Sequence, residues 1–254
     1  MNKIYLLIPL LLIALIPLTL SAQHTEKDID PSKPTNLYTQ VSLAFDYKSS
    51  DLQDLYGGRA SVSYAINEDN LLVAEVPLLR NSLTKKTGLS DIRVRYFTAV
   101  KRNITHNLIA IAPFVDITMP TGKFEDGLGT SSWALSAGGV VGLMFSEQFG
   151  LFPGIGIMYV TKPGTDLIPD SEKFSSTGIS FQFNASYSFD KDTYIFLNPT
   201  PSIMNTNGTW KTYWAGEVSF NKVIIPNKLQ VGLYWGPNFT DKTNSFRLGI
   251  SSFL

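Results

Sequence analysis

Residues 179–189, ISFQFNASYSF, alternate between apolar and polar side chains along their whole length. From Ile179 to Phe189 every second residue is apolar or aromatic, and the residues between them are Ser, Gln or Asn. Successive side chains of a β-strand point to opposite faces, so this period of two predicts a strand with one apolar and one polar face. Residues 37–47 repeat the pattern, with Thr39 as a mild exception.

The same period of two continues through the chain, and helical spacing of apolar residues is nearly absent. We expect about twelve strands, at residues 37–47, 58–66, 71–79, 91–100, 108–119, 133–144, 151–160, 179–189, 194–203, 210–221, 229–237 and 245–254. Tight links are expected at 67–70, 101–107, 146–150, 190–193 and 225–228, and mostly longer ones at 48–56, 80–90, 120–132, 161–176, 204–209 and 238–244.

Alternating short and long links are what a transmembrane up-and-down antiparallel β-barrel requires, with periplasmic turns at one end and extracellular loops at the other. The sequence therefore predicts an all-β fold, a barrel over residues 37–254 in the cell outer membrane with both termini periplasmic. A soluble secreted β-sandwich, whose apolar faces point inward, is the alternative. We favour the barrel because unpaired backbone groups have no partner in lipid, and only a closed sheet leaves no edge.

The first 22 residues have the composition of a secretory signal peptide. Lys3 supplies a basic start, residues 4–18 are almost wholly apolar, and the stretch ends in a small residue at Ala22. An uncleaved anchor is the alternative, because the apolar stretch nearly reaches the ~18 residues that a spanning helix needs. We expect residues 1–22 to be removed and residues 23–36 to form a flexible periplasmic N-terminus.

The composition excludes several classes of partner and chemistry. The 21 basic and 21 acidic residues balance, so nothing indicates nucleic acid as a partner. The absence of Cys excludes disulfides, thiol catalysis and thiolate metal sites. The partners we expect are outer-membrane lipid, the barrel-insertion machinery and small-molecule solutes, with the chain acting as a monomer.

Charged residues at the alternate positions that form the polar face of a strand should point into the lumen. If the turn that follows residue 79 is centred near Lys85, then Glu75 lies opposite Arg95, and Asp116 on the next strand lies near Arg93. This predicts a lumenal charge cluster of Arg59, Glu75, Arg93, Arg95, Asp116 and Glu217. The cluster would either neutralise buried charges inside a narrow barrel or act as a selectivity filter.

Closure of the barrel predicts further lumenal features. The first and last strands become neighbours, so Asp46 and Arg247 should pair across the seam. Open space should lie on the opposite wall, which carries small or neutral polar side chains at Ser180, Gln182, Asn184 and Ser186. The loop after residue 119 could fold inward as a constriction through Lys123, Glu125 and Asp126. About eight strands leave a filled interior and sixteen or more a wide channel, so a twelve-stranded bore suits one small solute at a time.

Three short motifs in the middle of the chain resemble those of a known family. They are GLSDI at 88–92, MPTGK at 119–123 and LGTSSW at 128–133. Together they resemble the outer-membrane barrels named for the meta-pathway of phenol degradation, over about residues 58–160, although Ser90 stands where that family usually has Gly. The resemblance implies a barrel proposed to move small, often aromatic or hydrophobic, molecules across the outer membrane.

The pattern of residues indicates neither an enzyme nor a cofactor site. His24 lies beside the predicted cleavage site and His106 in a predicted periplasmic turn, and neither has the fixed serine nucleophile that a phospholipase-type barrel requires. The chain has no Cys and no pair of His residues at ligand spacing for a metal. We therefore expect a passive channel for small molecules without a cofactor. The alternatives are a plugged structural or surface-interaction barrel without transport and an outer-membrane enzyme.

Overall fold

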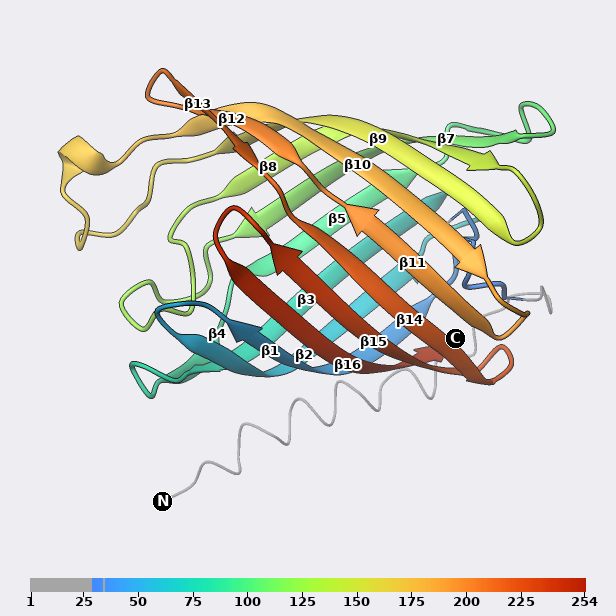
Figure 1. Ribbon diagram of the computed structural model, residues 1–254, viewed down its shortest axis with the longest axis horizontal. Coiled ribbons are helices and arrows are strands. Elements are labelled where there is room, and N and C mark those ends of the chain that lie inside the picture. Colours follow the sequence, from blue (N-terminus) through green and yellow to red (C-terminus); the bar gives the residue numbers. More distant parts are fainter. Residues whose placement is uncertain (1–28, 34) are drawn as a thin grey trace.

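The computed structural model describes residues 29–33 and 35–254, so the predicted signal peptide lies outside the described residues. Within them, sixteen antiparallel strands form one sheet that closes into a barrel (Figure 1). The strands are β1 (Gln40–Ser49), β2 (Asp54–Ala65), β3 (Asn70–Asn81), β4 (Thr87–Leu89), β5 (Ile92–Thr98), β6 (Lys101–Arg102), β7 (Leu108–Met119), β8 (Ala134–Met144), β9 (Phe149–Val160), β10 (Ser176–Ser188), β11 (Thr193–Pro199), β12 (Ser202–Thr206), β13 (Thr209–Tyr213), β14 (Gly216–Ile225), β15 (Leu229–Asn238) and β16 (Thr243–Phe253). A 3-10 turn, η3 (Asp170–Glu172), lies between β9 and β10, and no helix of the described residues is long and apolar enough to cross a bilayer.

The sixteen strands occupy twelve positions in the described wall, because four of them continue a neighbour along the chain. β4 and β6 extend β5 at its two ends, β12 continues β11 beyond Pro199, and β13 runs into β14. The wall closes because β1 pairs with both β2 and β16, while β10 pairs with β9 on one side and with β11 and β12 on the other. The predicted barrel of about twelve strands is therefore confirmed.

The two ends of the barrel differ in their links (Figure 1). The end where the C-terminus lies has tight turns, and we call it the short-turn end. The other end, the long-loop end, carries the links over residues 120–133 and 161–175. The link expected over residues 204–209 is there a two-residue turn, in which Asn207 and Gly208 have φ angles of 49° and 80°. Asn-Gly favours this tight hairpin turn, so β12 and β13 form a hairpin, of which β12 also pairs with β10.

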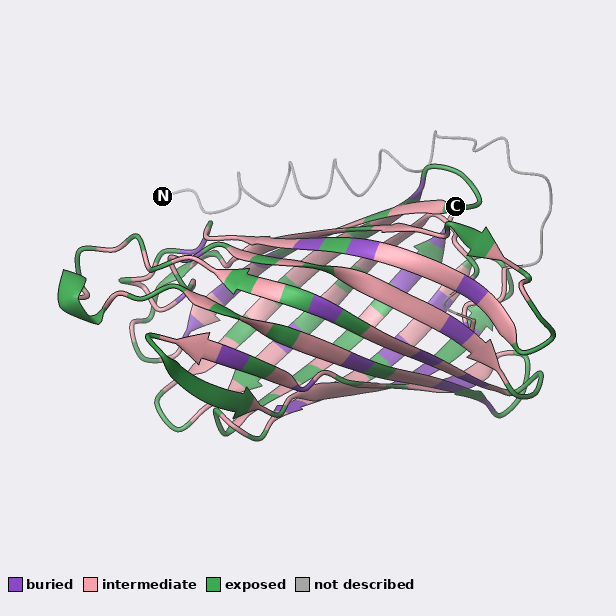
Figure 2. Ribbon diagram, turned by 90° about the horizontal axis from the view of Figure 1, so that it is seen from above, coloured by how far each residue is buried: buried purple, intermediate pink, exposed green. Residues whose placement is uncertain are grey.

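Burial alternates along the strands, as the period of two requires (Figure 2). Most apolar residues of the strands face outward, and Ile157 and Phe183, for example, are 70% and 52% exposed on the outer surface. Their polar neighbours face the lumen, where Gln182 and Ser186 are buried. A β-sandwich would place these faces the other way round. The outer wall is thus apolar around the barrel, and the polar groups lie in the lumen.

Candidate functional site

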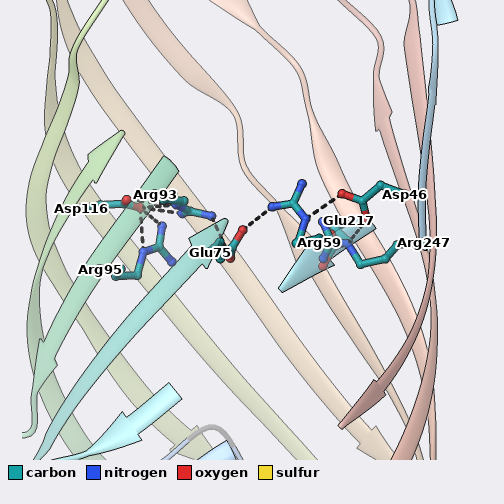
Figure 3. A network of polar contacts seen from close by, with 8 residues as sticks. All are labelled: Asp46, Arg59, Glu75, Arg93, Arg95, Asp116, Glu217 and Arg247. Atoms are coloured by element: carbon teal, nitrogen blue, oxygen red, sulfur yellow. Dashed lines mark hydrogen bonds and ion pairs between the residues drawn. The ribbon is translucent and has the colours of Figure 1, made fainter. Parts of the chain in front are cut away.

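A network of charged side chains crosses the lumen, and we call it the charge belt (Figure 3). Its members are Asp46 on β1, Arg59 on β2, Glu75 on β3, Arg93 and Arg95 on β5, Asp116 on β7, Glu217 on β14 and Arg247 on β16. These are the six residues that strand parity assigned to a lumenal cluster, together with the two assigned to the seam. Four arginines face four carboxylates, so the formal charges of the belt cancel.

The first half of the belt is built around Asp116. Its carboxylate accepts hydrogen bonds from Arg93, with Nη2 at 2.5 Å from Oδ2, and from Arg95. Arg93 also reaches Glu75, whose Oε1 lies 4.0 Å from Nη1. The other oxygen of Glu75 accepts from Nη1 of Arg59 at 2.5 Å. Glu75 therefore joins the two halves of the belt.

The second half of the belt spans the seam between the first and last strands. Asp46 and Arg247 are direct partners in the register of β1 and β16, with Nε at 2.9 Å from Oδ1. The second oxygen of Asp46 accepts from Nε of Arg59 at 2.7 Å. Nη1 of Arg247 lies 3.6 Å from Oε2 of Glu217 on β14. The ion pairs are thus continuous from Asp116 to Glu217.

The register of the hairpin formed by β3, β4 and β5 differs by two residues from the expected one. Glu75 faces Arg93 rather than Arg95, and Asp116 faces Arg95 rather than Arg93. The predicted pairing of Glu75 with Arg95 was therefore wrong, whereas the predicted proximity of Asp116 and Arg93 is confirmed by their hydrogen bonds. All four groups still meet, because the arginine side chains are long enough for both to reach Asp116.

The cause of this shift is the turn between β3 and β4. The side-chain oxygen of Asn81 accepts hydrogen bonds from the backbone N–H groups of Leu83 and Thr84, and its own backbone N–H donates to the carbonyl oxygen of Lys86. These bonds place the centre of the turn before Lys85. Lys85 follows that centre and has a φ of 59°. The turn held by this asparagine pairs Arg80 with Thr87, and an irregularity between β4 and β5 then moves the register by one residue, so that Glu75 pairs with Arg93.

The wall formed by β8 to β11 carries neutral groups on its inner face. Ser180 donates to the carbonyl oxygen of Gly156 at 3.4 Å, and Gln182 is buried. Ser186 is bonded to the chain segment that enters the barrel, and Asn184 lines a cavity. Of the four residues expected to line open space, Asn184 is therefore the one that lines a cavity described below.

The N-terminal segment, residues 29–33 and 35–39, lies inside the barrel at the short-turn end (Figure 1). Ser186 of β10 donates a hydrogen bond to the backbone oxygen of Ser32, which is 8% exposed. Arg102 of β6 donates from Nη1 to the backbone oxygen of Thr35 at 2.8 Å. The sequence had indicated a flexible stretch over 23–36. Its described residues are held by side chains of the wall, which bond to backbone oxygens that a side-chain pattern does not show.

Contacts within the N-terminal segment brace it further. Nζ of Lys33 lies 3.0 Å from Oδ2 of Asp30, and the hydroxyl of Ser32 donates a hydrogen bond to Oδ1 of Asp30 at 2.6 Å. Partial burial acts to raise the pKa of Asp30, but the hydrogen bond from Ser32 and the charge of Lys33 outweigh it and hold this pKa below its ordinary value. The carboxylate is therefore ionised at neutral pH and can hold both partners.

Cavities follow one another along the lumen. The first, of about 280 Å³, lies on the long-loop side and is lined by four residues of the charge belt. The second, of about 420 Å³, lies between Arg95 of the belt and residues 35–38 of the N-terminal segment. The third, of about 1310 Å³, lies between the N-terminal segment and the turns of the short-turn end. The charge belt and the N-terminal segment therefore divide the lumen into three spaces.

The loop after β7 is tied to neighbouring strands at the long-loop end. Asn81 donates from its side-chain nitrogen to the carbonyl oxygen of Asp126 at 3.0 Å. Lys123 and Glu125 are exposed to solvent. These two residues and Asp126 line none of the three cavities described above. Their role in a constriction stays a prediction.

The three motifs behind the family resemblance meet at Asp91. Its carboxylate accepts hydrogen bonds from the backbone N–H of Gly122 at 3.0 Å and of Thr130 at 2.8 Å. The hydroxyl of Thr130 donates to the same oxygen at 2.8 Å. A Cβ atom on Gly122 or Gly129 would lie 2.4 Å from a backbone oxygen of the facing motif. The motifs therefore fasten the long loop to the chain between β4 and β5.

The aromatic lining of the second cavity was missed by the sequence reasoning. Phe97, Phe152 and Phe196 line this cavity, on strands whose inner faces were expected to be polar. A signal was available, because Phe97 shares its parity with Arg95, and Phe196 shares its parity with Asn198. The lumen next to the N-terminal segment is therefore largely apolar on the side of these strands.

The described residues present no metal-binding cluster. No group of three or more His, Cys, Asp or Glu side chains in residues 29–33 and 35–254 is placed to hold a metal ion. His106 lines the third cavity at the short-turn end, and His24 lies outside the described residues. The largest group of ionised side chains in the described lumen is the charge belt, whose members are paired with one another.

Comparison with solved structures shows the fold. No family model matches the chain. An outer membrane channel from Pseudomonas putida F1 superposes with a TM-score of 0.64 at 13% sequence identity, covering 90% of this chain and 100% of that chain. The NanC porin superposes with a TM-score of 0.60 at 11% identity, covering 84% of this chain and 99% of that chain.

Among curated proteins, the chloroplastic CRS2-associated factor 1 of Oryza sativa subsp. japonica is 22% identical over 213 residues. The match covers 84% of this chain, which spans 25% of the length of that protein. This identity shows no family. The structural likeness does show that the chain has the β-barrel fold of outer-membrane channels and porins.

Proposed function

We propose that this protein is a passive channel for small molecules in the bacterial outer membrane, with its short-turn end and both termini in the periplasm. The row of cavities along the lumen, of about 280, 420 and 1310 Å³, carries this proposal. The exposed apolar side chains of the outer wall suit contact with lipid. Solutes would pass down their own concentration gradient.

The size and lining of the lumen support small solutes. The second cavity, of about 420 Å³, has room for one small molecule at a time. The resemblance to the barrels named for phenol degradation favours aromatic or hydrophobic solutes, and the phenylalanines of this cavity support that class. The belt would then be the step at which charged solutes are selected.

A plugged structural barrel is the second candidate, and the N-terminal segment favours it. This segment separates the second cavity from the third and is hydrogen-bonded to the wall at Ser32 and Thr35. In the channel that we propose, this segment moves aside to let solutes pass, whereas in a structural barrel it stays in place. The two candidates therefore differ in the behaviour of one short stretch of chain.

Single-channel recording of the refolded mature chain in planar bilayers distinguishes the two candidates. A Cβ at Gly142 would lie 3.1 Å from Cγ2 of Thr35, so a disulfide between Thr35→Cys and Gly142→Cys can lock the segment to β8. The chain has no cysteine of its own, so this bond is the only one that can form. We expect discrete openings in the wild type and in the reduced variant, and their loss on oxidation.

Single-cysteine variants are the control, because oxidation should leave their openings unchanged. A wild type that is folded yet silent would contradict the channel and support the plugged barrel. Equal conductance of the oxidised and reduced double variant would show that solutes pass without movement of the N-terminal segment.

A further inference from the structure

The first cavity, on the long-loop side of the charge belt, has charges of both signs on its wall. Asp46 is bound by two arginines, since one of its oxygens accepts from Arg59 and the other from Arg247. Arg59 is also bound to Glu75. These charges satisfy one another and leave little for a solute to bind.

Two other charged side chains of this cavity are less completely paired. Glu217 has one ion-pair partner among the described residues, with Nη1 of Arg247 at 3.6 Å from its Oε2, and its side chain is 34% exposed. Lys48 is exposed, and its ammonium group has no ion-pair or hydrogen-bond partner among the described residues. The cavity therefore presents one carboxylate and one ammonium group that are open to solvent.

The strand register places these two side chains on one row of the wall. Glu217 continues the register of β14 and β15 opposite Gly236. In the next two strand pairs Gly236 faces Ser245, and Ser245 faces Lys48. The ends of this row are three strand spacings apart, which is about 14 Å along the wall.

The middle of the row leaves room between the two charges. Gly236 has no side chain, and the hydroxyl of Ser245 donates to the carbonyl oxygen of Gly236 at 3.0 Å. The cavity in front of the row has a volume of about 280 Å³. Glu217 and Lys48 both point inward from a curved wall, so their charged ends lie closer together than their backbones. The gap between them therefore suits a molecule of a few carbon atoms.

We propose that the first cavity is a binding site for a small zwitterion, such as an α-amino acid, whose ammonium group pairs with Glu217 and whose carboxylate pairs with Lys48. In its transport role this proposal rests on the proposed channel function, because the cavity would then be the first site that a solute meets from the extracellular side. A simple cation or anion would pair with one of the two groups and lie near the like charge of the other. A zwitterion satisfies both, and its lack of net charge suits a belt whose formal charges cancel.

Equilibrium dialysis of the refolded mature chain at pH 7, with equal detergent on both sides of the dialysis membrane, tests the requirement for both charges. The probes are phenylalanine, 2-phenylethylamine and 3-phenylpropanoate, which share one body and carry both charges, the ammonium alone and the carboxylate alone. We expect phenylalanine to bind about three- to fivefold more tightly than either analogue, because an ion pair exposed to solvent contributes up to roughly this factor.

Two variants separate the two contacts. Lys48→Met should abolish the preference for phenylalanine over 2-phenylethylamine and keep the preference over 3-phenylpropanoate, because only the partner of the carboxylate is lost. Glu217→Gln should do the reverse. The matched controls Lys86→Met and Glu172→Gln change exposed residues at the same end of the barrel that line none of the three cavities, and they should keep both preferences.

Equal binding of phenylalanine and either analogue by the wild type would overturn the proposal. Survival, in either variant, of the preference that it should remove would do the same. Lys48 is exposed, so its variant should fold as the wild type does and decides the question even if Glu217→Gln does not fold.

Conductance of the same preparation separates this proposal from the channel function. A barrel that conducts but binds the three probes equally overturns the site and leaves the channel standing. A barrel that binds phenylalanine with the expected preferences but never conducts supports the site and overturns the channel.

Discussion

The two halves of the barrel wall fill the lumen differently. β1, β2, β3, β5, β7, β14 and β16 send eight charged side chains inward, which pair with one another across the strands (Figure 3). β8 to β11 carry mainly glycine, serine, asparagine and phenylalanine on their inner faces, and they line the second cavity together with β1, β2, β3, β5 and β7. Ion pairs between strands therefore hold one half of the wall, whereas the other half has none among its described residues and relies on uncharged side chains.

The largest expected difference between the halves is in stability, and one register pair tests it. Asp116 on β7 faces Ser136 on β8, so the two residues lie at the same level of the barrel. Asp116→Ala leaves Arg93 and Arg95 without their shared carboxylate and should lower the free energy of unfolding by about 3 kcal/mol. This is the lower end of the range for a broken buried pair, because the Arg93 side chain is 38% exposed.

Urea unfolding of the barrel refolded into vesicles measures this difference. The matched variant Ser136→Ala should change the free energy of unfolding by less than about 0.5 kcal/mol, because no charge is left behind. Equal losses in the two variants would contradict the view that the charged half holds more of the stability.

A smaller effect is expected within the neutral half, where two adjacent glycines differ in their surroundings. A Cβ on Gly138 would lie 2.1 Å from the carbonyl oxygen of Ile155, whereas a Cβ on Gly139 would have no atom within 4 Å. Gly138→Ala should therefore cost about 1–3 kcal/mol, since the strands must separate to admit the methyl group. Gly139→Ala should be nearly neutral in the same unfolding assay. Loss of stability in both variants would show that general flexibility, and not close approach of the strands, explains the glycines.

The sequence predicted which charged side chains face the lumen better than it predicted which of them pair with each other. A strand side chain has only two faces to choose between, so parity alone placed Arg59 and Glu217 in the lumen although they are far apart in the sequence. The partners depend on register, which the hydrogen bonds of Asn81 in a turn and the irregularity between β4 and β5 decide together. No alternation of apolar and polar residues contains that information.

The neutral half was harder to predict, for two physical reasons. Phenylalanine at an inward position, such as Phe152, looks like an outward residue to a rule that equates apolar with lipid-facing. The N-terminal segment is held through backbone oxygens such as that of Ser32, which every residue possesses. Side-chain patterns therefore could not place this segment beside β10.

The smallest expected effect concerns ion selectivity, and it asks whether the charged half does more than hold the wall together. The eight formal charges of the belt cancel, so the wild-type channel should select only weakly between cations and anions. Arg59 lies between Asp46 and Glu75, so Arg59→Gln leaves two carboxylates with less compensation and should favour cations. Asp46→Asn removes the partner of Arg59 and Arg247 and should favour anions.

Reversal potentials across a KCl gradient measure both shifts, which should be of opposite sign and roughly two- to fivefold in permeability ratio, or below about 1 kcal/mol. Ser180→Ala, on the neutral half, should move the reversal potential in neither direction. Shifts of the same sign in the two charge variants would mean that each merely loosens the wall. Opposite shifts, with no change in Ser180→Ala, would show that the belt also sets the electrostatic field through which ions pass. The effect of each variant would then follow the sign of the charge removed, and not the loss of the contact that this charge made.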